Sequence, residues 1–372
     1  KMDWFNSQIH HAYWDSCLIS MNDNQIKPNF LQKLKNAILI CETINEFEKI
    51  KKNNLSYVFL AHTVYKYRVI LALCRTYNIK IYTTANYNIQ IQNKNYDISW
   101  SYINKSKLNL KIKTKVISNY WDKRLRGKSN YKDAQVASNI KTNISSYPKN
   151  VILLHIFKDS PFNVIDNKRI FFDYFDWISK TLEILKKSDE KWAIRLHPNH
   201  KRWGENQTLI LKKILKNYNK NNLLIDNKLI SNNDMFSRVR RVVTFSGTSH
   251  LEASCFGIKP IIISEVTLSK LNKNLVLKPK NFKEYEKLLL TSSLDNKFKQ
   301  TKKKINLSKK IIYIRENLLS MRKIINTEHL YKNDKKRYDI NLSKKILINY
   351  KFLYKYMINK GKVIGNQRKW EF

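Results

Sequence analysis

The feature that most constrains the fold is a repeated alternation of short apolar segments with helical ones. In the second half of the chain each apolar segment has no polar face, and it ends in polar residues. Strands buried on both faces are typical of a parallel sheet that helices cover on both sides. The pattern predicts strands at 151–157, 192–198, 222–227, 240–247 and 259–264, with helices at 173–187, 209–219 and 249–257.

The first part of the chain shows the same alternation of apolar strands and helices. We predict strands at 37–41, 57–62 and 79–85, with a helix over 64–78 between the last two. A strand-helix-strand unit of this size implies a parallel pair with a right-handed crossover. A polar, Lys/Asn-rich region at roughly 100–150 then predicts a linker, and the chain turns helical and basic from about residue 281.

A chain of 372 residues favours two domains over one. We therefore predict an α/β protein with two Rossmann-like, doubly wound domains, at 1–145 and 146–300, with a cleft between them. A basic helical segment follows at 301–372. In such sheets ligands bind beyond the carboxyl ends of the strands, so the site is expected there.

The net charge of +42 suggests nucleic acid at first sight. However, Lys, Asn and Ile are frequent together along the whole chain, which is the bias of an AT-rich coding sequence. No element concentrates Arg and aromatic residues as a DNA-binding surface does. We predict no nucleic-acid partner, and interpret the lysines as a solvated surface or one that contacts an anionic membrane peripherally.

The cysteines, at positions 17, 41, 74 and 255, show no CxxC spacing, and three of them have apolar neighbours. Buried free thiols are therefore favoured over disulfides or zinc, and a cytoplasmic compartment is expected. No apolar run approaches the roughly 18 residues needed to span a bilayer, and no signal-peptide core is present at the N-terminus. We expect a soluble chain, or one peripheral to the inner face of the plasma membrane.

The stretch TFSGTSHLEASCFGIKPIII, residues 244–263, places a polar turn between a strand and a helix. Gly247 permits a tight turn, and Ser246, Thr248 and Ser249 are good N-cap residues. The helix start can then hold a phosphate or carboxylate, and Glu252 can reach a ribose hydroxyl. The competing interpretation is an ordinary capped helix.

In RLHPNH, residues 195–200, His197 closes a strand and Pro198 holds it extended. The imidazole can donate a hydrogen bond to a phosphate oxygen, and Arg195 can add positive charge. His200 is expected to face solvent. A structural histidine at a turn is the alternative. Because no matching carboxylates accompany HPNH, no metal site is predicted.

Two further strand ends carry candidate residues. Asp159 follows the first strand of the second domain in HIFKDSPFN, where a carboxylate can act as nucleophile or base. A plain loop-capping Asp explains the same pattern equally well. In the first domain, AHTVYKYR places His62, Tyr65 and Arg68 on the opposite wall of the expected cleft.

Taken together, DSPFN, FFDYFDW, RLHPNH and SGTSHLEASCFGIKP resemble, in order and spacing, the bacterial capsule-polysaccharide synthesis family, which includes Kdo transferases of GT-B arrangement. The resemblance covers about residues 150–265 and places the family's His-Pro element on His197 and Pro198. Its Gly-Thr turn and acidic helix fall on Gly247, Thr248 and Glu252.

This resemblance implies a glycosyltransferase of capsule or lipopolysaccharide biosynthesis that uses a CMP-activated sugar, Kdo above all, without metal or other cofactor. It also implies that Asp159 is the nucleophile, a role assigned by its order in the chain. The donor would bind the second domain through the residues named above, and a glycan or lipid-linked glycan acceptor would bind the first domain near His62 and Tyr65.

Other functions stay open at this stage. A CMP-sialic acid donor is the first alternative because sialyltransferases also carry a His-Pro element, and UDP- or CDP-linked donors come next. A non-catalytic polysaccharide-binding or assembly protein with the same fold is the alternative from another class. The basic C-terminal helices can contact anionic lipid or, as we favour, pack back across both domains.

Overall fold

The computed structural model describes residues 8–53, 55–60, 64–83, 90–91, 108–128, 146–159, 170–247, 249–264, 272–314 and 317. Its helices are α1 (Gln8–Ile19), α2 (Phe30–Lys51), α3 (Tyr67–Thr76), α4 (Thr114–Leu125), α6 (Tyr174–Leu185), α7 (Gln207–Ile214), α8 (Asn232–Arg238), α9 (Ser249–Cys255), α11 (Phe282–Leu290) and α12 (Lys302–Tyr313). Its strands are β1 (Tyr57–Leu60), β2 (Lys80–Thr83), β3 (Gln90–Ile91), β4 (Asn150–Leu153), β5 (Trp192–Arg195), β6 (Leu223–Asp226), β7 (Arg241–Thr244) and β8 (Ile261–Ile262).

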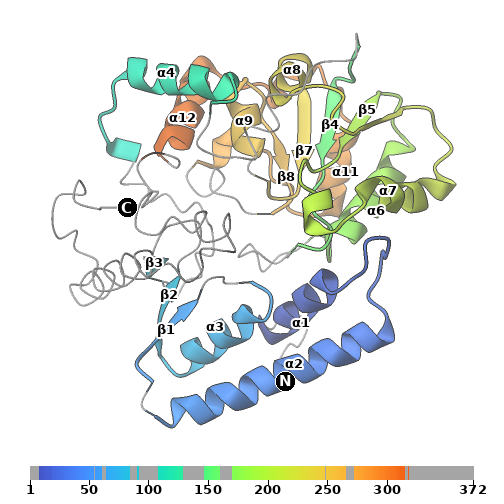
Figure 1. Cartoon of the computed structure of the whole chain (residues 1–372). Coiled ribbons are helices and arrows are strands. Elements are labelled where there is room, and N and C mark those ends of the chain that lie inside the picture. Colours follow the sequence, from blue (N-terminus) through green and yellow to red (C-terminus); the bar gives the residue numbers. More distant parts are fainter. Residues whose placement is uncertain are drawn as a thin grey trace, which may run out of the picture.

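A five-stranded, all-parallel sheet forms the larger unit, drawn at the top of Figure 1. Its strand order is β6-β5-β4-β7-β8, so the chain starts in the middle, winds outward to β6 and then returns to build the other half. This is the doubly wound order in which the direction of winding changes between β4 and β7. The predicted α/β fold class is confirmed.

Alternate residues of each strand enter two different hydrophobic clusters. Ile152, Ile194 and Val243 pack with α6, α7 and α11, whereas Val151 and Val242 pack with α8 and α9. Both faces of the sheet are therefore covered, which explains why the strands carry no polar face. The predicted strands and helices of this unit are confirmed, with ends that differ by a few residues.

The smaller unit, at the bottom of Figure 1, contains β1–β3 and helices α1–α3. Strands β1 and β2 are parallel and α3 connects them, as predicted, while β3 is antiparallel to β2. The strand predicted at 37–41 is wrong, because this run lies inside α2. A short apolar run does not distinguish a buried strand from a helix, and here a capping box at Asn29 and Gln32 begins a helix of 22 residues.

Two helices tie parts of the chain together across the predicted boundaries. α4 lies in the region predicted to be a linker, and its Trp121 packs in a cluster with Ile311 and Ile312 of α12. Leu18 of α1 belongs to the same hydrophobic cluster as α6 and α11. The domain limits 1–145, 146–300 and 301–372 stay a prediction, and residues 318–372 lie outside the described part.

Candidate functional site

The candidate site lies beyond the carboxyl ends of β4 and β7, where the winding of the sheet reverses. His155 follows β4, and the Ser246–Gly247 turn follows β7. The Ser246 backbone N–H donates to Nε2 of His155 at 3.2 Å. A Cβ at Gly247 would lie 3.2 Å from that same Nε2 and 3.1 Å from Thr244 Oγ1, so glycine permits the close approach of the turn to the imidazole.

His155 is half-buried and stacks on Tyr174, with ring centroids 4.9 Å apart and planes 6° from parallel. Burial, and then the nearby His197 and His250, lower the pKa of His155 to about 3. The ring is therefore neutral at pH 7. Because Nε2 accepts a hydrogen bond, the proton is assigned to Nδ1. The sequence interpretation missed this residue, although His155 and His197 both follow strands that end at the same edge.

His197 lies at the end of the neighbouring strand β5 and is partly exposed. Its Nδ1 accepts from the Asn199 backbone N–H at 3.2 Å, so the neutral ring carries its proton on Nε2. His197 is thus set up as a hydrogen-bond donor through Nε2, and both His197 and His250 are near enough to His155 to lower its pKa. Pro198 follows directly and is half-buried.

Asp159 lies in the turn after β4, where its backbone N–H donates to Ile156 O. The Tyr65 hydroxyl of the smaller unit donates to Asp159 Oδ1 at 2.5 Å. Burial, and then the Asp159 charge, raise the pKa of Tyr65, so this hydroxyl keeps its proton. Asp159 also acts on Tyr174, whose pKa is raised by burial and then by that carboxylate. Tyr174 stacks on His155, so this tyrosine lies between the Asp159 carboxylate and the His155 ring.

Tyr65 has a left-handed backbone, with φ 55°, immediately before α3. Its backbone N–H donates to Asp15 Oδ2 at 3.3 Å, and the buried carboxylate of Asp15 also lies 3.9 Å from Nε of Arg68. Non-glycine residues in this conformation are often found at functional sites. Arg68 is therefore directed to Asp15 inside the smaller unit, while Tyr65 reaches the candidate site. His62 lies outside the described residues.

Two buried side chains hold the β4 and β5 loops together. Gln207 donates to His155 O at 2.6 Å and accepts from the His197 N–H at 2.8 Å. The Glu205 carboxylate accepts from the backbone N–H groups of Phe157 and Lys158 at 3.1 and 3.0 Å. These bonds fix the backbone on either side of the site, and they were not predicted because nothing in the local sequence pairs residues so far apart.

His200, expected to face solvent, is buried instead. Its Nδ1 lies 2.8 Å from Glu205 O, and burial lowers its pKa. The expectation is wrong because the His197–Glu205 segment folds inward around this ring, with the His200 N–H donating to His197 O. His200 therefore has a structural place in the loop that carries His197.

Arg195 and Glu252, both predicted to bind the donor, belong to one polar network. Arg195 pairs with Asp226 at 2.6 Å and donates to Asn232 Oδ1 at 2.9 Å. Asn232 donates in turn to Glu252 at 3.1 Å, and Glu252 also pairs with Arg124. Protein groups already engage both charges, so direct contact with a nucleotide would require these bonds to rearrange. Their donor-binding roles stay predictions.

The turn before α9 is only partly described, since Thr248 lies outside the described residues. Ser249 is the first residue of α9, and His250 closes the turn by donating from Nδ1 to Gly247 O. Ser246 bonds through its side chain to Tyr174. The predicted approach of a phosphate to this turn therefore rests on Ser246, Gly247 and Ser249 among the described residues.

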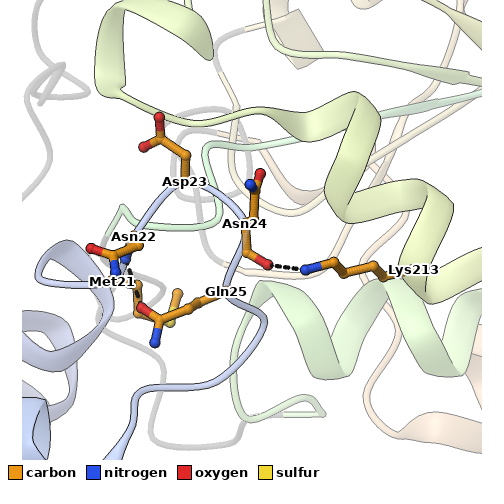
Figure 2. Close-up of a pocket in the computed structure, with 6 residues that line it drawn as sticks. All are labelled: Met21, Asn22, Asp23, Asn24, Gln25 and Lys213. Carbon is orange, nitrogen blue, oxygen red and sulfur yellow. Dashed lines mark hydrogen bonds between the residues drawn. The ribbon is translucent and has the colours of Figure 1, made fainter.

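A separate hollow of about 660 Å³ lies where the Met21–Gln25 loop meets α7 (Figure 2). Its lining is mostly polar, and Lys213 Nζ donates to Asn24 O across it at 2.7 Å. Asp23, on its rim, pairs at 3.0 Å with Lys158, the residue before Asp159. The Asp23–Lys158 ion pair thus connects the hollow with the loop that carries Asp159, but none of the residues that line the hollow is a histidine.

Other sequence expectations bear on the site indirectly. Cys17, Cys74 and Cys255 are buried free thiols, as predicted for three of the four cysteines, and Cys41 is exposed. Over the described residues, no cluster of His, Cys, Asp and Glu is arranged to hold a metal ion. None of the described helices combines the length and apolar character that crossing a bilayer requires.

Comparison with known proteins gives weak likenesses. No family model matches the sequence, and no significantly similar curated protein is found. Among solved structures, the chain is similar to KpsC of Thermosulfurimonas dismutans, a β-Kdo 2,4-transferase, with 11% identity and a TM-score of 0.41 over 68% of this chain and 78% of that chain. It is also similar to the UDP-GlcNAc 2-epimerase of Methanocaldococcus jannaschii, with 13% identity and a TM-score of 0.33 over 74% of this chain and 80% of that chain. Likenesses this weak assign neither family nor activity, and the α/β assignment rests on the strand order described above.

Proposed function

We propose that this chain is a metal-independent glycosyltransferase of surface-polysaccharide biosynthesis, which transfers Kdo from CMP-Kdo to a glycan. The observation that supports it is the placement of Asp159, His155 and His197 after the carboxyl ends of β4 and β5, beside the Ser246–Gly247 turn and near the point where the sheet changes its winding. The choice of CMP-Kdo rests on the motif resemblance alone.

In this proposal the Nε2–H of His197 donates to a phosphate oxygen of the donor, beside the turn at Ser246 and Gly247. The bond between the anomeric carbon and the phosphate oxygen breaks, and its electron pair leaves with CMP. The hydrogen bond strengthens as charge develops on that oxygen, which is how it would stabilise the transition state. Asp159 either attacks the anomeric carbon, forming an ester that the acceptor oxygen then displaces with loss of its proton, or removes the proton of the acceptor hydroxyl while that oxygen bonds to the anomeric carbon.

The acceptor would approach from the smaller unit, since Tyr65 of that unit already contacts Asp159. We propose that a glycan or lipid-linked glycan binds there, with His62 as a further contact. The proposed reaction is cytoplasmic and needs no cofactor beyond the nucleotide sugar.

Substitution of Asp159 tests this proposal. We expect Asp159→Asn to lower CMP release from CMP-Kdo by at least 10²-fold, because the side chain keeps its shape but loses the charge used in the reaction. The variant should still bind CMP. Asp189→Asn is the matched control, since that carboxylate is fully exposed. Unchanged turnover in Asp159→Asn would contradict the assigned role, and no turnover in the wild type would favour a binding or assembly protein.

A further inference from the structure

Helix α2 is apolar on two opposite sides, but the described structure covers only one of them. Ile40 and Phe47 point inward, where they are 4% and 5% exposed and pack against α1 and α3. The opposite side carries four exposed large side chains, which we call the outer stripe: Phe30 (79%), Leu31 (70%), Leu34 (46%) and Ile38 (51%).

The outer stripe follows from helical geometry. Leu31, Leu34 and Ile38 are three and four residues apart, so they share one face of the helix, and Phe30 adjoins them in the first turn. Figure 1 shows α2 along the edge of the smaller unit that is remote from the five-stranded sheet. Single exposed apolar residues are ordinary, but a contiguous patch of this kind indicates an interaction surface.

The charges beside the outer stripe indicate whether its partner is a second copy of the chain or a lipid surface. Residues 26–41 contain no acidic residue, and Lys27 and Lys35 are exposed near the stripe, whereas Lys33 lies toward α1 and the exposed Glu42 follows Ile38 by one turn. The whole chain carries a net charge of +42. Two copies of this face would bring like charges together, whereas an anionic lipid surface would attract the lysines and accept the apolar side chains.

We propose that the outer stripe of α2 docks on an anionic membrane surface, with its apolar side chains at the level of the headgroups and its lysines on lipid phosphates. This places the contact on the smaller unit, and not on the basic C-terminal helices considered from the sequence. The inference does not depend on which sugar is transferred.

The decisive variant is Leu31→Gln/Leu34→Gln, which leaves the net charge unchanged and keeps the capping residues Asn29 and Gln32. The probe is co-sedimentation of the full chain with phosphatidylcholine vesicles that contain about one-third phosphatidylglycerol. We expect the wild type to bind them and the variant to bind at least tenfold more weakly. Binding that equals the wild type would overturn the proposal, because non-specific attraction of a basic protein would then explain it.

Two matched controls separate the alternatives. Leu294→Gln removes another exposed leucine (62% exposed) from the larger unit and should not change binding. Lys302→Glu/Lys303→Glu changes charge on the exposed start of α12 and should weaken binding less than Lys27→Glu/Lys35→Glu does. The opposite order would move the contact to the C-terminal helices and overturn the assignment to α2.

Cys41 offers an independent reporter, because it lies on the same side of α2 and is exposed, whereas the other three cysteines are buried. A polarity-sensitive dye on Cys41 should shift to shorter wavelength with the anionic vesicles and stay unchanged in buffer. Self-association would instead shift the dye without vesicles and double the mass seen in sedimentation. The variant Leu31→Gln/Leu34→Gln would abolish that doubling. A wild type that does not bind, with a variant of lowered melting temperature, would show that the chain itself covers the stripe.

Discussion

At the scale of single residues, the site depends on a histidine whose charge is suppressed. His155 lies under the Ser246–Gly247 turn and stacks on Tyr174. Its pKa of about 3 arises first from burial. A neutral His155 can accept the Ser246 N–H, which a protonated ring cannot do, so the shape of the turn depends on the absence of this charge.

This arrangement predicts how stability depends on pH. Between about pH 6.5, where His titrates in unfolded chains, and pH 3, the unfolded state binds one proton more than the folded state does at His155. Stability should therefore fall as the pH falls through this window, by about 1.4 kcal/mol per pH unit at most. In urea unfolding at several pH values, the slope of the unfolding free energy against pH should be smaller for His155→Gln than for the wild type, by the equivalent of up to one proton. An unchanged slope would show that His155 is not held neutral.

The contact between Tyr65 and Asp159 makes a second prediction. A hydrogen bond from Tyr65 favours the charged form of the carboxylate, so its loss should raise the pKa of Asp159. Tyr65→Phe should lower turnover about tenfold and move the acid limb of the pH–rate profile to higher pH, with CMP binding unchanged. Tyr57→Phe, at an exposed position, is the control. A lower rate with the same pH profile would show that Tyr65 acts only on packing.

At the scale of elements, an ion pair joins the ends of two neighbouring strands. Arg195 of β5 and Asp226 of β6 are both buried, and the Tyr147 hydroxyl donates to the same Asp226 oxygen at 2.7 Å. Removing one partner of such a pair leaves an uncompensated buried charge.

Asp226→Asn should therefore lower the free energy of unfolding by about 3–5 kcal/mol, as measured by urea denaturation. Asp189→Asn breaks only an exposed pair with Lys220, and its effect should stay within about 1 kcal/mol. If both variants lose the same small amount of unfolding free energy, the Arg195–Asp226 pair does not stabilise this edge of the sheet.

Which elements could be predicted depends on how local their signals are. The five parallel strands were predictable, because neighbouring residues such as Val151 and Ile152 are buried on opposite faces of the sheet and give continuous apolar runs. The run at 37–41 has the same appearance but belongs to a helix with two apolar sides, a distinction that depends on which side finds a partner.

The candidate site was predictable in part for the same reason. Strand ends locate Asp159, His197 and the Ser246–Gly247 turn along the sequence, and parallel pairing brings them to one edge. Long-range contacts were not predictable: Gln207 bridges two loops, and Arg195 pairs with Asp226 of the neighbouring strand. No local pattern encodes such pairs.

At the scale of the whole molecule, several contacts join the two α/β units near the site. Tyr65 contacts Asp159, Asp23 pairs with Lys158, and the Trp14 indole N–H donates to Asp173 at 3.3 Å. The wall expected to present the acceptor is thus connected directly to the loop that carries Asp159. Substrates would have to enter with these contacts in place or open them first.

Calorimetric titration of nucleotides tests the central claim most directly. We predict that CMP binds the wild type at least tenfold more tightly than UMP or GMP, that His197→Ala weakens CMP binding at least tenfold by removing the Nε2–H donor, and that Asp159→Asn binds CMP like the wild type. Binding of no nucleotide, or equal CMP affinity in His197→Ala, would contradict the proposal that this sheet edge holds the donor phosphate.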